Sequence, residues 1–192
     1  MSCRSSSYQA QTIPMNGVEV RVLTDPSDQP PAAAVLAIFR SLELVPDRHR
    51  ELLRGGGYLQ ISKRLCPPDK GGGHDPETPW VRISRAAADE TRNHTYAITM
   101  LHEFGHIVDT RFGAMAWLRA NDPDGFAFLA GTAHEGRTDW EGERFADCYM
   151  LYMLNEVAQY PTGHRADRAA YEGEAAQQRY RIMLSTPAFR TS

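Results

Sequence analysis

The sequence predicts an α+β domain, and three of its features carry that prediction. Three short segments, 18–22, 58–63 and 80–84, alternate apolar and polar residues, which is the period of a half-buried β-strand. Longer segments repeat apolar residues three and four positions apart, the period of helices that bury one face. Clusters of Pro, Gly, Asn and Asp separate these segments, as they do at turns. We therefore expect a small sheet combined with several helices.

Length, charge and cysteine content limit the class of protein. The 192 residues suggest a single domain, predicted over 13–192, after a polar, Ser-rich stretch at 1–12 that we expect to be a disordered tail. The net charge of −3 gives no field that favours nucleic acid or an anionic membrane, and no apolar run approaches a membrane span. The three cysteines are too few and too scattered for a disulfide framework. The N-terminus lacks the features of a signal peptide, so we expect a cytoplasmic protein or one exported by a route that needs no signal peptide.

The first half of the chain is expected to hold the strands and two helices. After the strand at 18–22, Pro31 opens a helix that runs to about Leu44 and stops at Val45 and Pro46. A short helix follows, and its His49 is expected on a solvated face because its neighbours are charged. The strand at 58–63 leads into a long Pro/Gly loop at 66–79, and the third strand, 80–84, comes after it.

The second half is expected to be helical. An apolar helix is predicted over 95–112, with Asn93 placed to cap its start and Gly113 placed to follow its end. A short helical piece at 114–118, a turn at 121–125 and an apolar piece at 126–130 come next. Two further helices are predicted, one over 138–159 that a Thr138–Glu141 capping box opens, and one over 167–184.

The helix at 95–112 contains His-Glu-Phe-Gly-His, in which His102 and His106 are four residues apart. On a helix this spacing places both imidazoles on one face, where they can bind one metal ion. Glu103 lies beside them and is placed to act as a base on a water that this metal activates. Since the rest of the helix is apolar, burial of these polar groups would be unfavourable without a partner. The motif therefore predicts a zinc site (Zn2+).

A catalytic zinc site needs a third protein ligand. A histidine six residues after His106 would complete the metzincin pattern, but Phe112 occupies that position and Asp109 replaces the required glycine. The next long helix offers Glu143, which begins an otherwise apolar stripe, with Asp147 one turn later. Because buried carboxylates need strong partners, we predict Glu143 as the third ligand. Asp147 is predicted to accept a hydrogen bond from a zinc-bound imidazole.

Three further residues are expected to support this centre. Gly105 weakens its helix by about 1 kcal/mol relative to alanine, which suggests that it lets another segment approach closely. Ala146 is small and would allow the two helices to pack together at the metal. Asp109 falls on the ligand face, and it is expected either to hydrogen-bond a zinc histidine or to pair with Arg111 or another base, rather than to bind the metal.

Two motifs, His-Glu-x-Gly-His-x-x-Asp at 102–109 and Glu-x-Phe-Ala-Asp at 143–147, together resemble gluzincin zinc metallopeptidases. The resemblance is to the group of the anthrax lethal factor catalytic domain, the Pro-Pro endopeptidases and Mlc titration factor A. It implies a minigluzincin-like (zincin) domain, with a small twisted sheet packed on the HExxH helix and a glutamate helix opposite. It also implies the three zinc ligands His102, His106 and Glu143, with Glu103 as the general base.

This chain differs from the group in the residue that would stabilise the oxyanion. The group's lethal-factor-like members carry a tyrosine shortly before the third ligand, whereas this chain has no tyrosine between Gly113 and Cys148. His134 lies nearest to that place and is the catalytic hydrogen-bond donor that we expect, with His164 as the alternative.

The function expected from these residues is zinc-dependent hydrolysis of peptide bonds in a peptide or protein substrate. The strand at 80–84 is expected to form a sheet edge that pairs with the extended substrate. One alternative is a zinc-binding regulatory or interaction module with little turnover, although an intact Glu103 argues against it. Another is a delivered toxin or effector protease that acts on one specific protein.

Overall fold

The computed structural model describes residues 9–15, 18–24, 32–53, 58–62, 72–75, 80–84, 94–131, 140–154 and 173–190. The chain divides into two compact units, residues 1–104 and 105–192, and the boundary falls inside helix α3 (His94–Phe112). Helices account for most of the described residues, and a sheet accompanies them. The prediction of a single domain over 13–192 stays a prediction.

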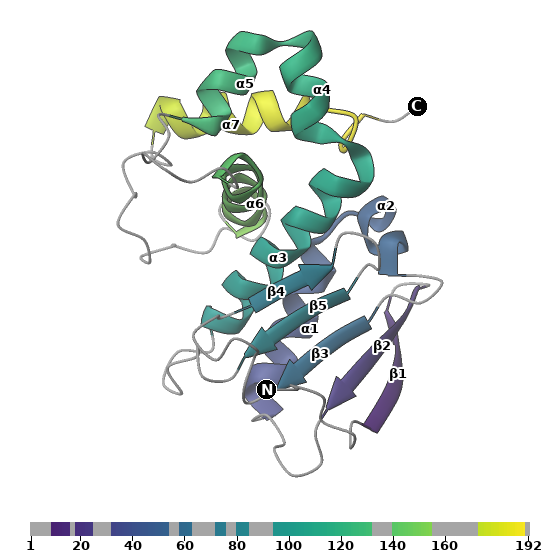
Figure 1. The fold of residues 1–192 in the computed structure, drawn as a ribbon. Coiled ribbons are helices and arrows are strands. Elements are labelled where there is room, and N and C mark those ends of the chain that lie inside the picture. The colour runs from purple at the N-terminus through teal and green to yellow at the C-terminus, as the bar shows by residue number, and fades with distance from the viewer. Residues whose placement is uncertain are drawn as a thin grey trace, which may run out of the picture. The chain divides into compact units, whose positions relative to one another are not determined.

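The first unit contains a five-stranded sheet with the order β1-β2-β3-β5-β4 (Figure 1). β1 (Gln9–Met15) pairs antiparallel with β2 (Val18–Thr24), which pairs parallel with β3 (Tyr58–Ser62). β3 pairs parallel with β5 (Trp80–Ser84), and β4 (Gly72–Asp75) pairs antiparallel with the other side of β5. β2, β3 and β5 begin at the residues where the alternating patterns begin, and their ends lie within two residues of the predicted ends.

Three expectations about this sheet are wrong. Residues 9–12, assigned above to a disordered tail, belong to β1, because the hairpin with β2 extends as far as the pair Gln9–Thr24, while residues 1–8 lie outside the described part. β4 lies inside the predicted loop at 66–79. The strand at 80–84 is not a sheet edge, since β5 lies between β3 and β4. Its backbone is therefore paired on both sides and cannot add an extended substrate.

Helix α1 (Ala32–Leu44) begins directly after Pro31, as predicted, and a short α2 (Asp47–Arg50) and a 3-10 turn η1 (Glu51–Leu53) follow. The prediction of a solvated His49 is wrong, because its side chain is only 1% exposed. Its neighbours Arg48 and Glu51 are exposed. The segment therefore has a solvated face and a buried face, and His49 lies on the buried one.

The second unit is made of helices. α4 (Ala114–Asn121), α5 (Pro123–Ala130), α6 (Trp140–Tyr152) and α7 (Gly173–Leu184) follow the second half of α3 (Figure 1). α6 contacts α4, α5 and α7. The predicted turn at 121–125 is a junction between two helices, where Asp122 caps α5 by accepting a hydrogen bond from the Gly125 amide at 2.9 Å. Thr138 and residues 155–172 lie outside the described part, so the capping box and the predicted ends at 159 and 167 are not tested.

Aromatic rings hold α6 in place within this unit. Phe145 stacks on Tyr149 with ring centroids 6.5 Å apart, and Tyr149 also lies 6.0 Å from the ring of Phe189. Tyr152 meets the ring of Tyr180 on α7 edge-on at 5.4 Å. Such pairs add to the stabilisation from apolar burial, so α6 has a defined position against α7 and the C-terminal turn. No helix in the described ranges has the length and apolar character needed to cross a membrane.

Candidate metal centre

Helix α3 runs without interruption through both histidines of the motif. His102 and His106 are therefore about one turn apart on the same face, and each is 8% exposed. The helix ends before Gly113, whose φ of 62° is the left-handed conformation expected at this position. This agrees with the predicted end of the helix, while Asn93, the predicted cap, lies outside the described residues.

Glu143, in the first turn of α6, meets the imidazole of His106. Its Oε1 lies 3.4 Å from Nε2 of His106, and one ligand atom each from His102, His106 and Glu143 lie within 4.8 Å of one another. Ligand atoms bound about 2.1 Å from one tetrahedral zinc ion are about 3.4 Å apart. Two imidazole nitrogens and one carboxylate oxygen are also a donor set that catalytic zinc sites use. The three residues could therefore hold a metal ion.

The close approach of α6 to α3 depends on Gly105. A Cβ built on this glycine would lie 2.8 Å from the Cα of Ala146, closer than real Cβ contacts allow. It would also lie 3.2 Å from the carbonyl oxygen of Ala146 and 3.2 Å from the Cβ of Tyr149. The prediction that Gly105 admits a neighbouring segment is confirmed, and Ala146 lies at this contact. The role predicted for the small size of Ala146 stays a prediction.

The first turn of α6 runs along the ring of His106. Glu143 faces Nε2, while a Cβ on Gly142 would lie 3.6 Å from Nδ1, an ordinary contact distance. The amide groups at a helix N-terminus carry partial positive charge, which favours carboxylates in the first turn. Glu141 and Glu143 both occupy this turn, so both carboxylates lie at the helix end where negative charge is favoured.

Glu141, which we predicted in the untested capping box with Thr138, has a partner on another helix. Its carboxylate forms an ion pair with the guanidinium of Arg119 on α4. The same guanidinium lies 4.8 Å above the ring of Phe126 on α5. Arg119 therefore links the helix that carries Glu143 to two other helices, and no signal in the sequence connects residues so far apart.

Asp109 forms a hydrogen bond with the first turn of α4. Its Oδ1 accepts a hydrogen bond from the Met115 amide at 2.8 Å. Burial raises the pKa of this carboxyl, and the hydrogen bond from Met115 and the charge of His106 oppose the shift. This contact is structural, and the hydrogen bond to a zinc histidine stays a prediction.

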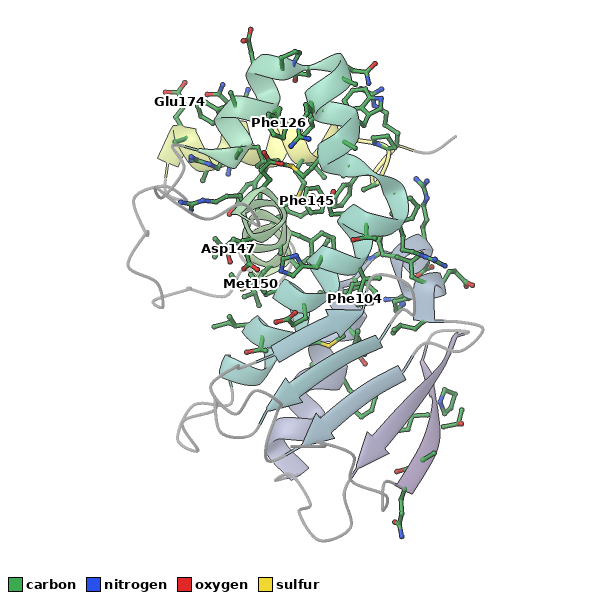
Figure 2. All side chains as sticks on the ribbon, in the orientation of Figure 1. Phe104, Phe126, Phe145, Asp147, Met150 and Glu174 are labelled. Atoms are coloured by element: carbon green, nitrogen blue, oxygen red, sulfur yellow. The ribbon has the colours of Figure 1, made fainter. Side chains whose placement is uncertain are left out.

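The structure does not test the roles predicted for four further residues, which are Asp147, Glu103 and the two candidate oxyanion donors. Asp147 is 9% exposed, one turn beyond Glu143, and leaves α6 on a different side from Phe145 (Figure 2). Glu103 is half-buried on α3 beside His102. The roles predicted for these two stay predictions. His134 and His164 lie outside the described residues.

Comparisons with known proteins add no family to these observations. No family model matches the chain, and no curated protein matches it either. The gluzincin resemblance thus rests on the motifs at 102–109 and 143–147, and the structure supports a group of two histidines and one glutamate that could hold a metal ion.

Proposed function

We propose that this protein is a zinc-dependent endopeptidase with a minigluzincin-like domain. His102, His106 and Glu143 would hold the zinc ion, and Glu103 would be the general base. The observation that carries the proposal is the convergence of three ligand atoms from two helices to within 4.8 Å of one another. The glutamate that directly follows the first histidine adds the one further group that hydrolysis needs.

The chemistry follows from what each group can do. Zinc bound here supplies a Lewis acid and lowers the pKa of a coordinated water to about 7. Two neutral imidazoles and one carboxylate would hold the ion, so Glu143 would contribute the only ligand charge. Glu103 takes a proton from the attacking water and returns it to the leaving amine. Burial of both histidines lowers the local dielectric constant, which strengthens these charge interactions.

A second candidate is a zinc-binding regulatory module with little turnover. The lack of a tyrosine between Gly113 and Cys148 favours it, since a known oxyanion donor of the resembling group is missing from its place. Glu103 favours the peptidase, because a structural zinc site has no use for a base.

Metal analysis and cleavage of a peptide library separate the two candidates. Wild type, Glu103→Gln and a control, Glu174→Gln on the exposed first turn of α7, are compared. The peptidase proposal expects about one equivalent of zinc in all three proteins, with cleavage reduced at least about 100-fold in Glu103→Gln alone. Bound zinc without cleavage by the wild type would favour the regulatory module. Failure of the wild type to bind zinc would refute both candidates.

A further inference from the structure

Helices α3 and α6 meet at Gly105 and Ala146, where no side chain of residue 105 separates the two backbones. Two of the three atoms nearest to a Cβ on Gly105 are backbone atoms of Ala146, at 2.8 and 3.2 Å. Helix backbone cannot rotate away from a clash as the end of a flexible side chain can. The third atom, at 3.2 Å, is the Cβ of Tyr149, a residue with no exposed surface. A methyl group at position 105 therefore requires the helices to move apart.

This contact lies within one turn of two of the predicted ligands. Gly105 precedes His106, and Ala146 follows Glu143 by three residues on α6. The two ligand atoms are 3.4 Å apart, close to the separation of about 3.4 Å that a shared tetrahedral ion gives. Metal–ligand distances tolerate deviations of only about 0.2 Å. A small outward displacement of α6 would therefore carry the carboxylate of Glu143 beyond the ion.

We propose that the Gly105–Ala146 contact is the positioning element of the metal centre. It sets the distance between α3 and α6, and through that distance it determines whether Glu143 reaches an ion that His106 holds. Neither residue touches the ion, and both act through Glu143. The proposal rests on the metal site of the proposed function, and it makes helix spacing, beside ligand identity, a determinant of zinc affinity.

A double-mutant cycle on the full chain tests this, with zinc affinity measured by competition against a chelating indicator. Gly105→Ala should lower the affinity at least tenfold, to the level of Glu143→Ala. The double variant Gly105→Ala/Glu143→Ala should bind no more weakly than either single variant, because both changes remove the same ligand. Replacing Ala146 with glycine in the Gly105→Ala background should not restore affinity, because the clash is with backbone atoms.

A control separates positioning from loss of stability. Met183→Ala removes a fully buried side chain of α7 and should destabilise the protein, yet keep wild-type zinc affinity at temperatures where circular dichroism shows it folded. If Gly105→Ala does not fold, the cycle is run with Ala146→Gly, which removes atoms and lets the helices shift. That variant should lose affinity, and its loss should be non-additive with that of Glu143→Ala.

The outcomes distinguish this proposal from the proposed function. Unchanged zinc affinity in folded Gly105→Ala, or losses that add to that of Glu143→Ala, would overturn the positioning role and leave the peptidase intact. If the wild type binds zinc and the affinity losses of Gly105→Ala and Glu143→Ala are non-additive, the positioning role is supported. If the same protein does not cleave peptides, the peptidase proposal is refuted. A wild type that does not bind zinc would overturn both.

Discussion

At the scale of single residues, Asp109 lies near a predicted metal ligand but hydrogen-bonds the start of a neighbouring helix. It holds the amide of Met115 in the first turn of α4, a position where a helix has amide groups without partners inside the helix. Burial raises its pKa, with a smaller contribution from Glu141, while the hydrogen bond from Met115 and the charge of His106 lower it. The net upward shift means that the ionised carboxylate is less favourable in the folded than in the unfolded chain.

Replacement of Asp109 by Asn should stabilise the metal-free protein, and increasingly so as pH rises. Between the usual and the raised pKa the folded state binds more protons than the unfolded state, so wild-type stability falls with rising pH through that interval. Asn has no charge to bury and keeps an oxygen that can accept from Met115. Urea unfolding of both chelator-treated proteins between about pH 3 and pH 7 measures the difference. A difference that stays constant over this range would contradict the shift.

At the scale of single elements, Arg50 closes the end of α1. The last carbonyl groups of a helix lack partners within it. Nη1 of Arg50 donates to the carbonyl oxygens of Leu42 and Glu43, both at 3.2 Å, and to that of Val45 at 2.6 Å. The guanidinium is buried, and its Nη2 pairs with Asp47. Its positive charge also complements the partial negative charge at this helix end.

Arg50→Met should destabilise the protein by about 2–3 kcal/mol, because buried carbonyl groups lose a charged donor. Urea unfolding measures the change. Arg40→Met, on an exposed position of α1, is the matched control and should change stability by less than about 0.5 kcal/mol. Equal effects of the two substitutions would show that the contacts of Arg50 at the end of α1 contribute little.

At the scale of the whole molecule, the predicted zinc site joins positions that are far apart in the chain. His106 and Glu143 belong to different helices, α3 and α6, with α4 and α5 between them in sequence. An ion held by both would bind the folded state and not the unfolded state, in which these ligands are separated. Folding and metal binding are therefore expected to be coupled.

Zinc should accordingly raise the melting temperature of the protein, and a chelator should lower it. At a free zinc concentration 100 times the dissociation constant, the stabilisation is about 2.7 kcal/mol. Thermal unfolding with zinc, with a chelator and with neither measures the effect. His106→Ala should melt at one temperature in all three conditions, and a zinc-dependent rise in that variant would show that the ion binds elsewhere.

Many elements could be predicted because their signals are local. Pro31 marks the start of α1, alternation marks the strand at 80–84, and the glycine at position 113 marks the end of α3. β4 could not be predicted, because Gly-Gly-His-Asp has no alternating pattern and forms a strand by pairing with β5. The burial of His49 could not be predicted either, because the charges around it indicate a solvated segment.

The sequence by itself determined the spacing of His102 and His106 and the presence of Glu103 beside them, because one helical turn relates these positions in any α-helix. It also indicated, through Gly105, that another backbone approaches here. Only the tertiary structure decided that Glu143 lies 3.4 Å from His106, that Glu141 pairs with Arg119 and that β5 is internal. The physical reason is that helix geometry is the same in every chain, whereas partners distant in sequence are selected by packing.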